Sequence, residues 1–253
     1  MFKAVIEDIS LLRDSLDAVS ALINEGTFKV TSNGLSLIAM DPANVAMVLY
    51  DLLASAFTEY DCTGDAKLTI NVPYLVSILK RAGNNDSVEF KLLDGSNALS
   101  VKMTGDSTRT FTLPLIDSHI NAIKPPEKLN DGFKAEIELE AGALREGAKD
   151  ALMVSDCVLL SCDGSSFVMR AVSDTNEVNL QLSKESPSLL RVESSGAVKS
   201  KYSLEYLDKM MKVSKVSKTV MVRFSNDYPL KLDYTALDKL KVSFILAPRI
   251  DTE

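Results

Sequence analysis

Two segments of this chain recur about 130 residues downstream, and this duplication constrains the fold more than any other feature. Segment 2–4 (FKA) returns as 133–135, an offset of 131 (133 minus 2). Segment 39–44 (AMDPAN) is matched by 171–176 (AVSDTN), an offset of 132 (171 minus 39). A repeat of that length is a whole domain. We therefore predict that one architecture is present twice and that any function uses both copies.

Length and composition are those of an ordered two-domain protein. A chain of 253 residues is long enough for two domains that each bury their own core. Apolar residues make up 46% and charged residues 25%, unlike a disordered chain. No apolar run approaches the roughly 20 residues of a membrane-spanning helix, and the N-terminus turns acidic where a signal peptide is apolar. We expect an intracellular protein.

Charge and cysteine content restrict the function further. The chain has 28 basic and 35 acidic side chains, a formal net charge of −7. This sum argues against a nucleic-acid partner unless the basic residues gather on one surface. The three cysteines, Cys62, Cys157 and Cys162, form no CxxC pair. We predict that they stay reduced and serve as small core residues.

Apolar spacing predicts the order helix, strands, helix, strands in the first half. Leu12, Leu16, Val19 and Ile23 step by 4, 3 and 4 residues, which predicts a helix over 10–23 with one buried stripe. Asn33-Gly34 supplies the backbone angles of a tight hairpin. A second helix begins at Pro73. The predicted strands are 28–30, 35–40, 45–52, 88–93, 99–103 and 108–115.

The second half repeats this order after a segment without hydrophobic periodicity. Residues 117–132 include Pro125-Pro126, which favours an extended surface linker between domains 1–116 and 133–253. Helices are predicted around 144–151 and over 203–213. The predicted strands are 158–161, 167–172, 178–182, 220–224, 230–234 and 242–246.

Seven motifs in order resemble one known family. They are MFKAVIED (1–8), LINEG (22–26), MDPANVAMV (40–48), LPLID (113–117), SLEYLDKMMK (203–212), YPLKLDY (228–234) and LAPRI (246–250). On these residues the chain resembles the proliferating cell nuclear antigen family of sliding clamps, particularly its archaeal form. The resemblance implies an α+β fold of two similar clamp-type domains. Their helices would line an inner face and their antiparallel sheets would lie outside, in a closed ring of three subunits around DNA.

The resemblance also implies where subunits meet. Strand 108–115 of one subunit would pair with 176–182 of the next, which would close two sheet edges. The alternative is that both are ordinary edge strands of a monomer. The implied interface residues are Thr110, Phe111, Thr112, Leu113, Val178, Leu180 and Leu182.

Basic residues on the helices would face the DNA, since each Lys or Arg near the duplex displaces counterions without reading a base. They are Arg13, Lys80, Arg81, Arg145, Lys149, Lys209 and Lys212. Arg13 and Arg145 occupy matched positions in the two copies, whereas an isolated charge is more often part of a solvated helix face. Acidic residues share these helices, and relatives can carry basic residues at the positions of Ser20, Ser77, Met153 and Glu205. We expect a weakly positive wall that slides, with a topological link in place of tight binding.

A partner-peptide pocket is the second surface that the resemblance implies. Its predicted walls are Met40, Val45, Met47, Ile123, Pro125, Pro229, Leu246, Ala247 and Pro248. Methionines suit a site that serves several ligands, because their flexible side chains repack. For Met40 or Val45 alone, plain core packing is the simpler interpretation. The residues do not decide whether Ile120, Ile123 or Leu129 forms the rim.

We find no pattern typical of catalysis. The sequence has no phosphate loop, no metal-ligand spacing and no nucleophile elbow, and the single histidine, His119, lies in the linker. We therefore expect no catalytic residue, metal or cofactor. The implied partners are double-stranded DNA, two further copies of the chain, a DNA polymerase, flap endonuclease, DNA ligase and an ATP-dependent clamp loader, with no membrane. The implied location is the replication fork, in the cytoplasm if the source is archaeal.

Two other functions remain open from the residues. One is a subunit of a heterotrimeric or checkpoint-type clamp, and the other is an acidic duplicated enzyme. The mass of the assembly in solution separates the homotrimer from a lone subunit.

Overall fold

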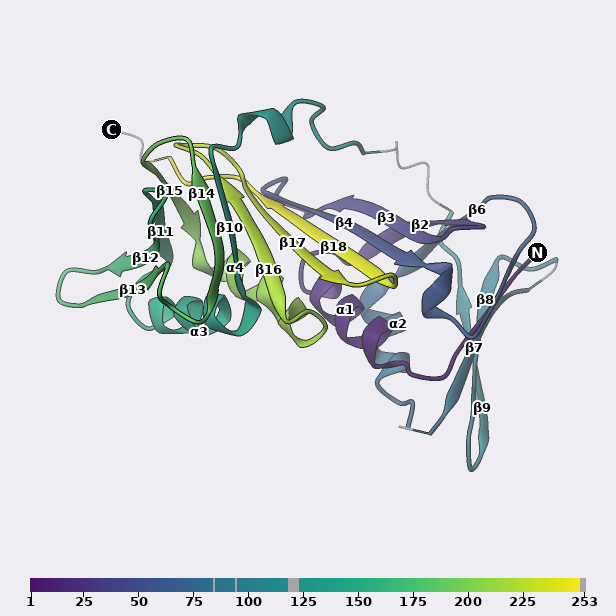
Figure 1. The fold of residues 1–253 in the computed structure, drawn as a ribbon. Coiled ribbons are helices and arrows are strands. Elements are labelled where there is room, and N and C mark those ends of the chain that lie inside the picture. The colour runs from purple at the N-terminus through teal and green to yellow at the C-terminus, as the bar shows by residue number, and fades with distance from the viewer. Residues whose placement is uncertain (84, 94, 118–122, 251–253) are drawn as a thin grey trace. The chain divides into compact units, whose positions relative to one another are not determined.

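The computed structural model describes residues 1–83, 85–93, 95–117 and 123–250. Within these residues both halves of the chain run in the same order: strand, helix, five strands, helix, three strands (Figure 1). The predicted duplication is therefore confirmed. The chain divides into two compact units, and each unit includes a short segment from the other half of the sequence. Unit 1 is Met1–Met40, Val48–Ile123 and Ala236–Val242. Unit 2 is Asp41–Met47, Lys124–Thr235 and Ser243–Glu253.

The first half contains two helices. Its elements are β1 (Phe2–Ile6), α1 (Ser10–Ser20), β2 (Glu25–Thr31), β3 (Gly34–Met40), β4 (Ala46–Leu53), a 3-10 helix (Ala54–Ala56), β5 (Glu59–Cys62), β6 (Ala66–Asn71), α2 (Val72–Leu79), β7 (Ser87–Leu92), β8 (Ala98–Thr104) and β9 (Thr108–Pro114). The stripe Leu12, Leu16 and Val19 of α1 is buried, as its spacing predicts. At α2, the Asn71 side chain caps the helix by accepting the Tyr74 N–H at 2.8 Å, and Pro73 follows in the first turn.

The second half has the equivalent elements. They are β10 (Ala135–Glu140), α3 (Ala141–Leu152), β11 (Cys157–Cys162), β12 (Ser166–Val172), β13 (Glu177–Ser183), β14 (Leu189–Ser194), β15 (Val198–Ser203), α4 (Leu204–Met211), a 3-10 helix (Lys212–Lys215), β16 (Thr219–Phe224), β17 (Leu230–Ala236) and β18 (Leu240–Leu246). In each half the two helices pack against each other, α1 with α2 and α3 with α4.

Antiparallel sheets carry these helices. Unit 1 holds a five-stranded sheet in the order β5-β1-β7-β8-β9, and β2 pairs with both β3 and β6. Unit 2 holds the four-stranded order β13-β12-β11-β15, and β10 lies between β14 and β16. Strands β9 and β13 each end a sheet.

A hairpin forms between β2 and β3 as predicted, but of Asn33 and Gly34 only Gly34 has a positive φ. Thr31 pairs with Gly34, whose φ is 135°, in the region that only glycine adopts readily. A Cβ on Gly34 would lie 2.1 Å from the carbonyl oxygen of Leu52. Only glycine fits this close approach.

Three sequence predictions need correction. The apolar patterns miss β1, β5, β6, β10, β14 and β15, several of which lie at sheet edges with exposed faces and are defined by backbone pairing. Among the cysteines only Cys162 is buried, whereas Cys62 and Cys157 are half-buried, and all three are free thiols. The linker does not stay extended, since Leu129–Gly132 forms a 3-10 helix with Leu129 buried.

No helix in the described parts of the chain is both long and apolar enough to span a bilayer. His119 and Ile120 lie outside the described residues.

Candidate functional site

The loop between β3 and β4 is organised by one carboxylate. Asp41 is 5% exposed. Its Oδ1 accepts the N–H groups of Val45 and Ala46, both at 2.7 Å, and its Oδ2 accepts that of Ala43 at 3.1 Å. Asn44 has a φ of 58°. These bonds fix the backbone of a loop that otherwise lacks regular structure, and Asn is among the residues that tolerate the left-handed turn.

A tyrosine from helix α4 completes the site. The Tyr206 hydroxyl donates to Asp41 Oδ2 at 2.7 Å, and the bond raises the pKa of Tyr206 to about 12. Burial by itself would raise the pKa of Asp41, but hydrogen bonds, chiefly from Ala46, Tyr206 and Val45, outweigh it and hold that pKa below its ordinary value. Lys209 lies over the Tyr206 ring, with Nζ 5.2 Å from the centroid. The loop is therefore tied to the helix that carries Lys209, one of the predicted DNA-facing residues.

The C-terminal tail runs beside the same loop in unit 2. Ala247 N–H donates to the Val45 carbonyl at 3.0 Å, and Arg249 N–H donates to the Lys201 carbonyl at 2.7 Å. The tail is thus held by backbone bonds both at the loop and at β15. A cavity of about 820 Å³ lies next to it, lined by apolar side chains such as Leu159 and by charged ones such as Lys199 and Arg249.

The predicted pocket residues differ in exposure. Val45, Pro125, Pro229, Ala247 and Pro248 are half-buried members of unit 2. Met47 and Leu246, also in unit 2, are buried, so they lie beneath the surface. Met40 and Ile123 are half-buried and belong to unit 1. The structure directly joins Val45 to Ala247 among the predicted set.

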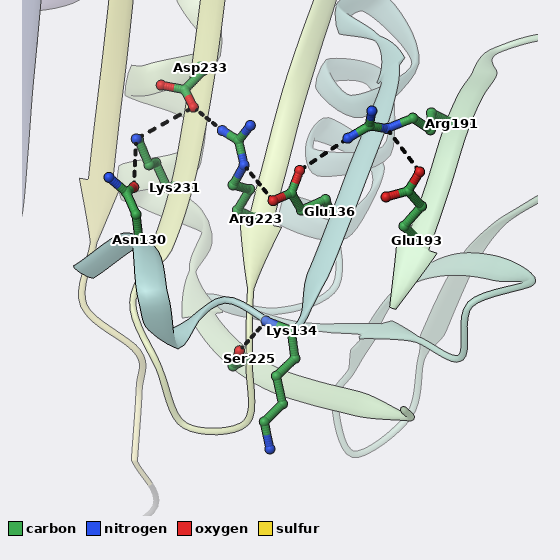
Figure 2. Close-up of polar contacts among 9 residues, drawn as sticks. All are labelled: Asn130, Lys134, Glu136, Arg191, Glu193, Arg223, Ser225, Lys231 and Asp233. Atoms are coloured by element: carbon green, nitrogen blue, oxygen red, sulfur yellow. Dashed lines mark hydrogen bonds and ion pairs between the residues drawn. The ribbon is translucent and has the colours of Figure 1, made fainter. Parts of the chain in front are cut away.

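The end of the connecting segment is fastened to unit 2 (Figure 2). Lys231 Nζ donates to the Asn130 side chain at 3.0 Å, and the Tyr228 hydroxyl donates to the Leu129 carbonyl at 3.2 Å. Ser225 Oγ donates to the Gly132 carbonyl at 2.6 Å. A side chain on Gly132 would collide with the Tyr228 ring. Residues 129–132 therefore form a fixed anchor for the segment that precedes them.

An ion-pair ladder crosses the neighbouring strands in Figure 2. Glu136 on β10 bridges Arg191 at 3.1 Å and Arg223 at 3.3 Å. Arg223 also pairs with Asp233 on β17, which Lys231 approaches at 3.7 Å. The Asp233 side chain is only 10% exposed, so its pairing matters more than that of the exposed members. The ladder ties four strands together on the face next to the anchor.

The predicted DNA-facing residues of unit 1 are largely neutralised by their neighbours. Arg13 pairs with Asp14 at 2.8 Å on α1, and Lys80, just after α2, reaches Asp17 at 2.6 Å. Arg81 is exposed, and no carboxylate among the described residues lies within ion-pair distance of it.

Unit 2 has the same arrangement. Lys149 pairs with Glu146 at 2.9 Å, and Arg145 lies 3.6 Å from the same carboxylate. Lys209 pairs with Glu205 at 2.7 Å. Lys212 is exposed and, within the described part of the chain, has no ion-pair partner. The helices of both units therefore present mixed charge with one uncompensated cation each at the end of α2 and α4.

The predicted interface strands match each other. Phe111 on β9 and Val178 on β13 are half-buried, whereas Leu113 and Leu182 near the ends are buried. Leu180 packs toward α3, where a Cβ on Gly147 would collide with it. Thr110 and Thr112 are exposed. Among the described residues, each of the two strands has one side without a neighbouring strand.

Sequence reasoning missed the Asp41–Tyr206 contact, although both residues lie in motifs that carry the family resemblance. An Asp followed by Pro and Asn is a turn signal, but a partner 165 residues away is set only by the fold. Among the described residues, no group of three or more His, Cys, Asp or Glu side chains is placed to hold a metal ion.

Comparison with known proteins decides the family. The family models for the N-terminal and C-terminal domains of proliferating cell nuclear antigen match residues 1–121 and 129–249. The chain belongs to the proliferating cell nuclear antigen family. It is 36% identical to a DNA polymerase sliding clamp of Thermococcus fumicolans and 33% identical to one of Pyrococcus horikoshii, each over 99% of both chains. The crystal structure of PCNA from Thermococcus kodakaraensis matches with a TM-score of 0.91 at 28% identity, over 98% of this chain and 100% of that one.

Proposed function

We propose that the chain is a DNA sliding clamp, a non-enzymatic processivity factor that encircles duplex DNA as a homotrimer. Family membership over both halves supports the clamp function. The ring is supported by two strands, β9 and β13, which leave open edges in the two halves. Closing such edges against further copies satisfies their backbone groups.

The observation that carries the ring is a pairing already present inside the chain. In the repeat, β18 of the second half corresponds to β9 of the first, and β4 of the first half corresponds to β13 of the second. Leu53 N–H donates to the Lys239 carbonyl at 2.8 Å in unit 1, and Ala247 N–H donates to the Val45 carbonyl at 3.0 Å in unit 2. In each unit, therefore, a backbone bond ties an end of β4 to an end of β18. A second copy is the partner whose β13 can meet β9 in the same way.

Mixed charge on the helices suits a sliding contact. Most predicted DNA-facing cations already pair with a carboxylate, for example Lys80 with Asp17. Few unpaired cations therefore remain to bind phosphates and fix the protein at one position along the DNA. Retention on DNA then comes from the closed ring. This is a topological link that salt does not break.

Partner enzymes would dock where the loop between β3 and β4 lies beside the C-terminal tail. Val45, Ala247 and Pro248 offer half-buried apolar surface on a backbone fixed by Asp41, and a fixed socket loses little entropy when a peptide binds. We propose a DNA polymerase, flap endonuclease and DNA ligase as its ligands. A separate ATP-dependent loader would open the ring at the replication fork, in the cytoplasm of an archaeon.

Two measurements test this function. The mass in solution should be three times the 27.6 kDa of the chain. After loading, the protein should stay on circular duplex DNA in high salt and slide off a linear one. A stable monomer would point to a subunit of a heterotrimeric clamp, and equal loss from both DNA forms would remove the topological mechanism.

A further inference from the structure

Two exposed apolar side chains lie in different parts of the chain, and each has a counterpart in the other copy of the repeat. Tyr74 on α2 is 51% exposed and Val172 at the end of β12 is 50% exposed. Tyr74 corresponds to Tyr206 (206 minus 74 is 132), since each is the third residue of the second helix in its half. Val172 and Ser173 correspond to Met40 and Asp41 at the same offset of 132.

Tyr206 and Asp41, the counterparts of Tyr74 and Ser173, meet inside unit 2. Tyr206 donates its hydroxyl to Asp41, the residue next to Met40, at 2.7 Å. The hydroxyl of Tyr74, in contrast, has no hydrogen-bond partner among the described residues, and 172–177 are all exposed. The repeat therefore presents two surfaces, around Tyr74 and over 172–177, that nothing in the described part of the single chain covers.

We infer that Tyr74 of one subunit packs against Val172 and the Ser173–Asn176 loop of the next. The inference rests on the proposed ring, because the loop follows directly into β13, the strand proposed to meet β9 of the neighbour. The second copy is the proposed occupant because the bond between Tyr206 and Asp41 joins the equivalent helix and loop within unit 2.

The contact between subunits would differ from its intrachain counterpart in one respect. Ser173 replaces Asp41, so a neutral hydroxyl stands where a carboxylate accepts the tyrosine. The Ser173 hydroxyl instead serves its own loop, where it accepts the Asn176 N–H at 3.2 Å. The contact is therefore mainly apolar, between the Tyr74 ring and Val172.

The test is the dissociation constant of the trimer, measured by sedimentation on the full chain. Tyr74→Ala and Val172→Ala should each raise this dissociation constant about tenfold, because each removes one side of a contact between an aromatic ring and an apolar side chain. The double variant should raise it by less than the product of the two single effects, because both remove the same contact. Leu190→Ala, which alters a side chain on β14 that is 52% exposed, is the matched control and should leave it unchanged.

The outcomes separate this inference from the proposed ring. A wild-type chain that never forms a trimer would refute the ring itself. A stable wild-type trimer whose dissociation is unaffected by Tyr74→Ala, or whose two effects simply multiply, would overturn the inference and leave the ring intact. Thermal unfolding of each variant identifies loss of folding, and Tyr74→Phe, which keeps the ring of the side chain, should stay within a few-fold of wild type.

Discussion

The loop after β3 and the loop after β12 occupy the same place in the repeat but are built differently. In the first, the Asp41 N–H meets the Ala46 carbonyl at 2.8 Å across four intervening residues. In the second, the Ser173 N–H meets the Asn176 carbonyl at 2.8 Å across two. The two extra residues and the buried carboxylate turn a simple hairpin into a fixed wall beside the C-terminal tail.

The difference between these two loops shows how a chain with two copies of one domain can have a specialised site in only one copy. Only the first copy of the loop holds backbone N–H groups on a carboxylate and a tyrosine from the other half. A ring of three such chains would therefore have three partner pockets, although it repeats the same domain six times. The longer loop also corrects the sequence alignment, because Asn176 matches Ala46 and not Asn44.

The largest expected effect comes from blocking the proposed ring edge. Val178→Asp should convert the trimer to monomer and raise its dissociation constant more than 100-fold, since a charge buried in the interface without a partner costs several kcal/mol. Sedimentation measures it, with Leu190→Asp on β14 as the control. A trimer that survives Val178→Asp would contradict pairing through β13.

The next effect should distinguish the two loops directly. Asp41→Ala leaves several N–H groups without their acceptor and should weaken binding of a peptide from the cognate DNA polymerase by about 2 kcal/mol, or roughly 30-fold. Ser173→Ala, the matched change in the other copy, should leave peptide affinity within about twofold. Titration calorimetry on both variants checks this, and equal losses would show that the loops do not differ in function.

A smaller effect is expected from the tyrosines. Tyr206→Phe removes only the hydroxyl that donates to Asp41 and should lower peptide affinity about fivefold to tenfold. Tyr74→Phe should leave peptide affinity unchanged, since its proposed contact is with the neighbouring subunit. If both variants lose affinity alike, the Tyr206–Asp41 bond has no specific role in positioning the pocket.

Sequence patterns predicted the frame better than the site. The buried stripes of α1 and α4 and the Asn33-Gly34 hairpin follow from local spacing and turn chemistry. Strand β5 (EYDC) is only four residues long, and its pairing with β1 is a long-range property. The Asp41–Tyr206 bond spans 165 residues and was not predictable from either segment. The resemblance supplied the candidate site residues, but which of them are buried came from packing.

The smallest effect is a pH dependence that only the first loop should show. Because hydrogen bonds hold the pKa of Asp41 below its ordinary 3.8, its ionised form stabilises the folded chain fully above about pH 3.8, and the contribution is lost as pH falls through the lower folded value. The gap in unfolding free energy between wild type and Asp41→Asn should therefore stay constant from pH 7 to about pH 4 and narrow below it. Urea unfolding at several pH values measures the gap. The difference in unfolding free energy between wild type and Ser173→Ala should not change over this pH range, because no ionisable group is removed there. If the difference for Asp41→Asn widens in acid, the ionised Asp41 carboxylate does not stabilise the folded chain.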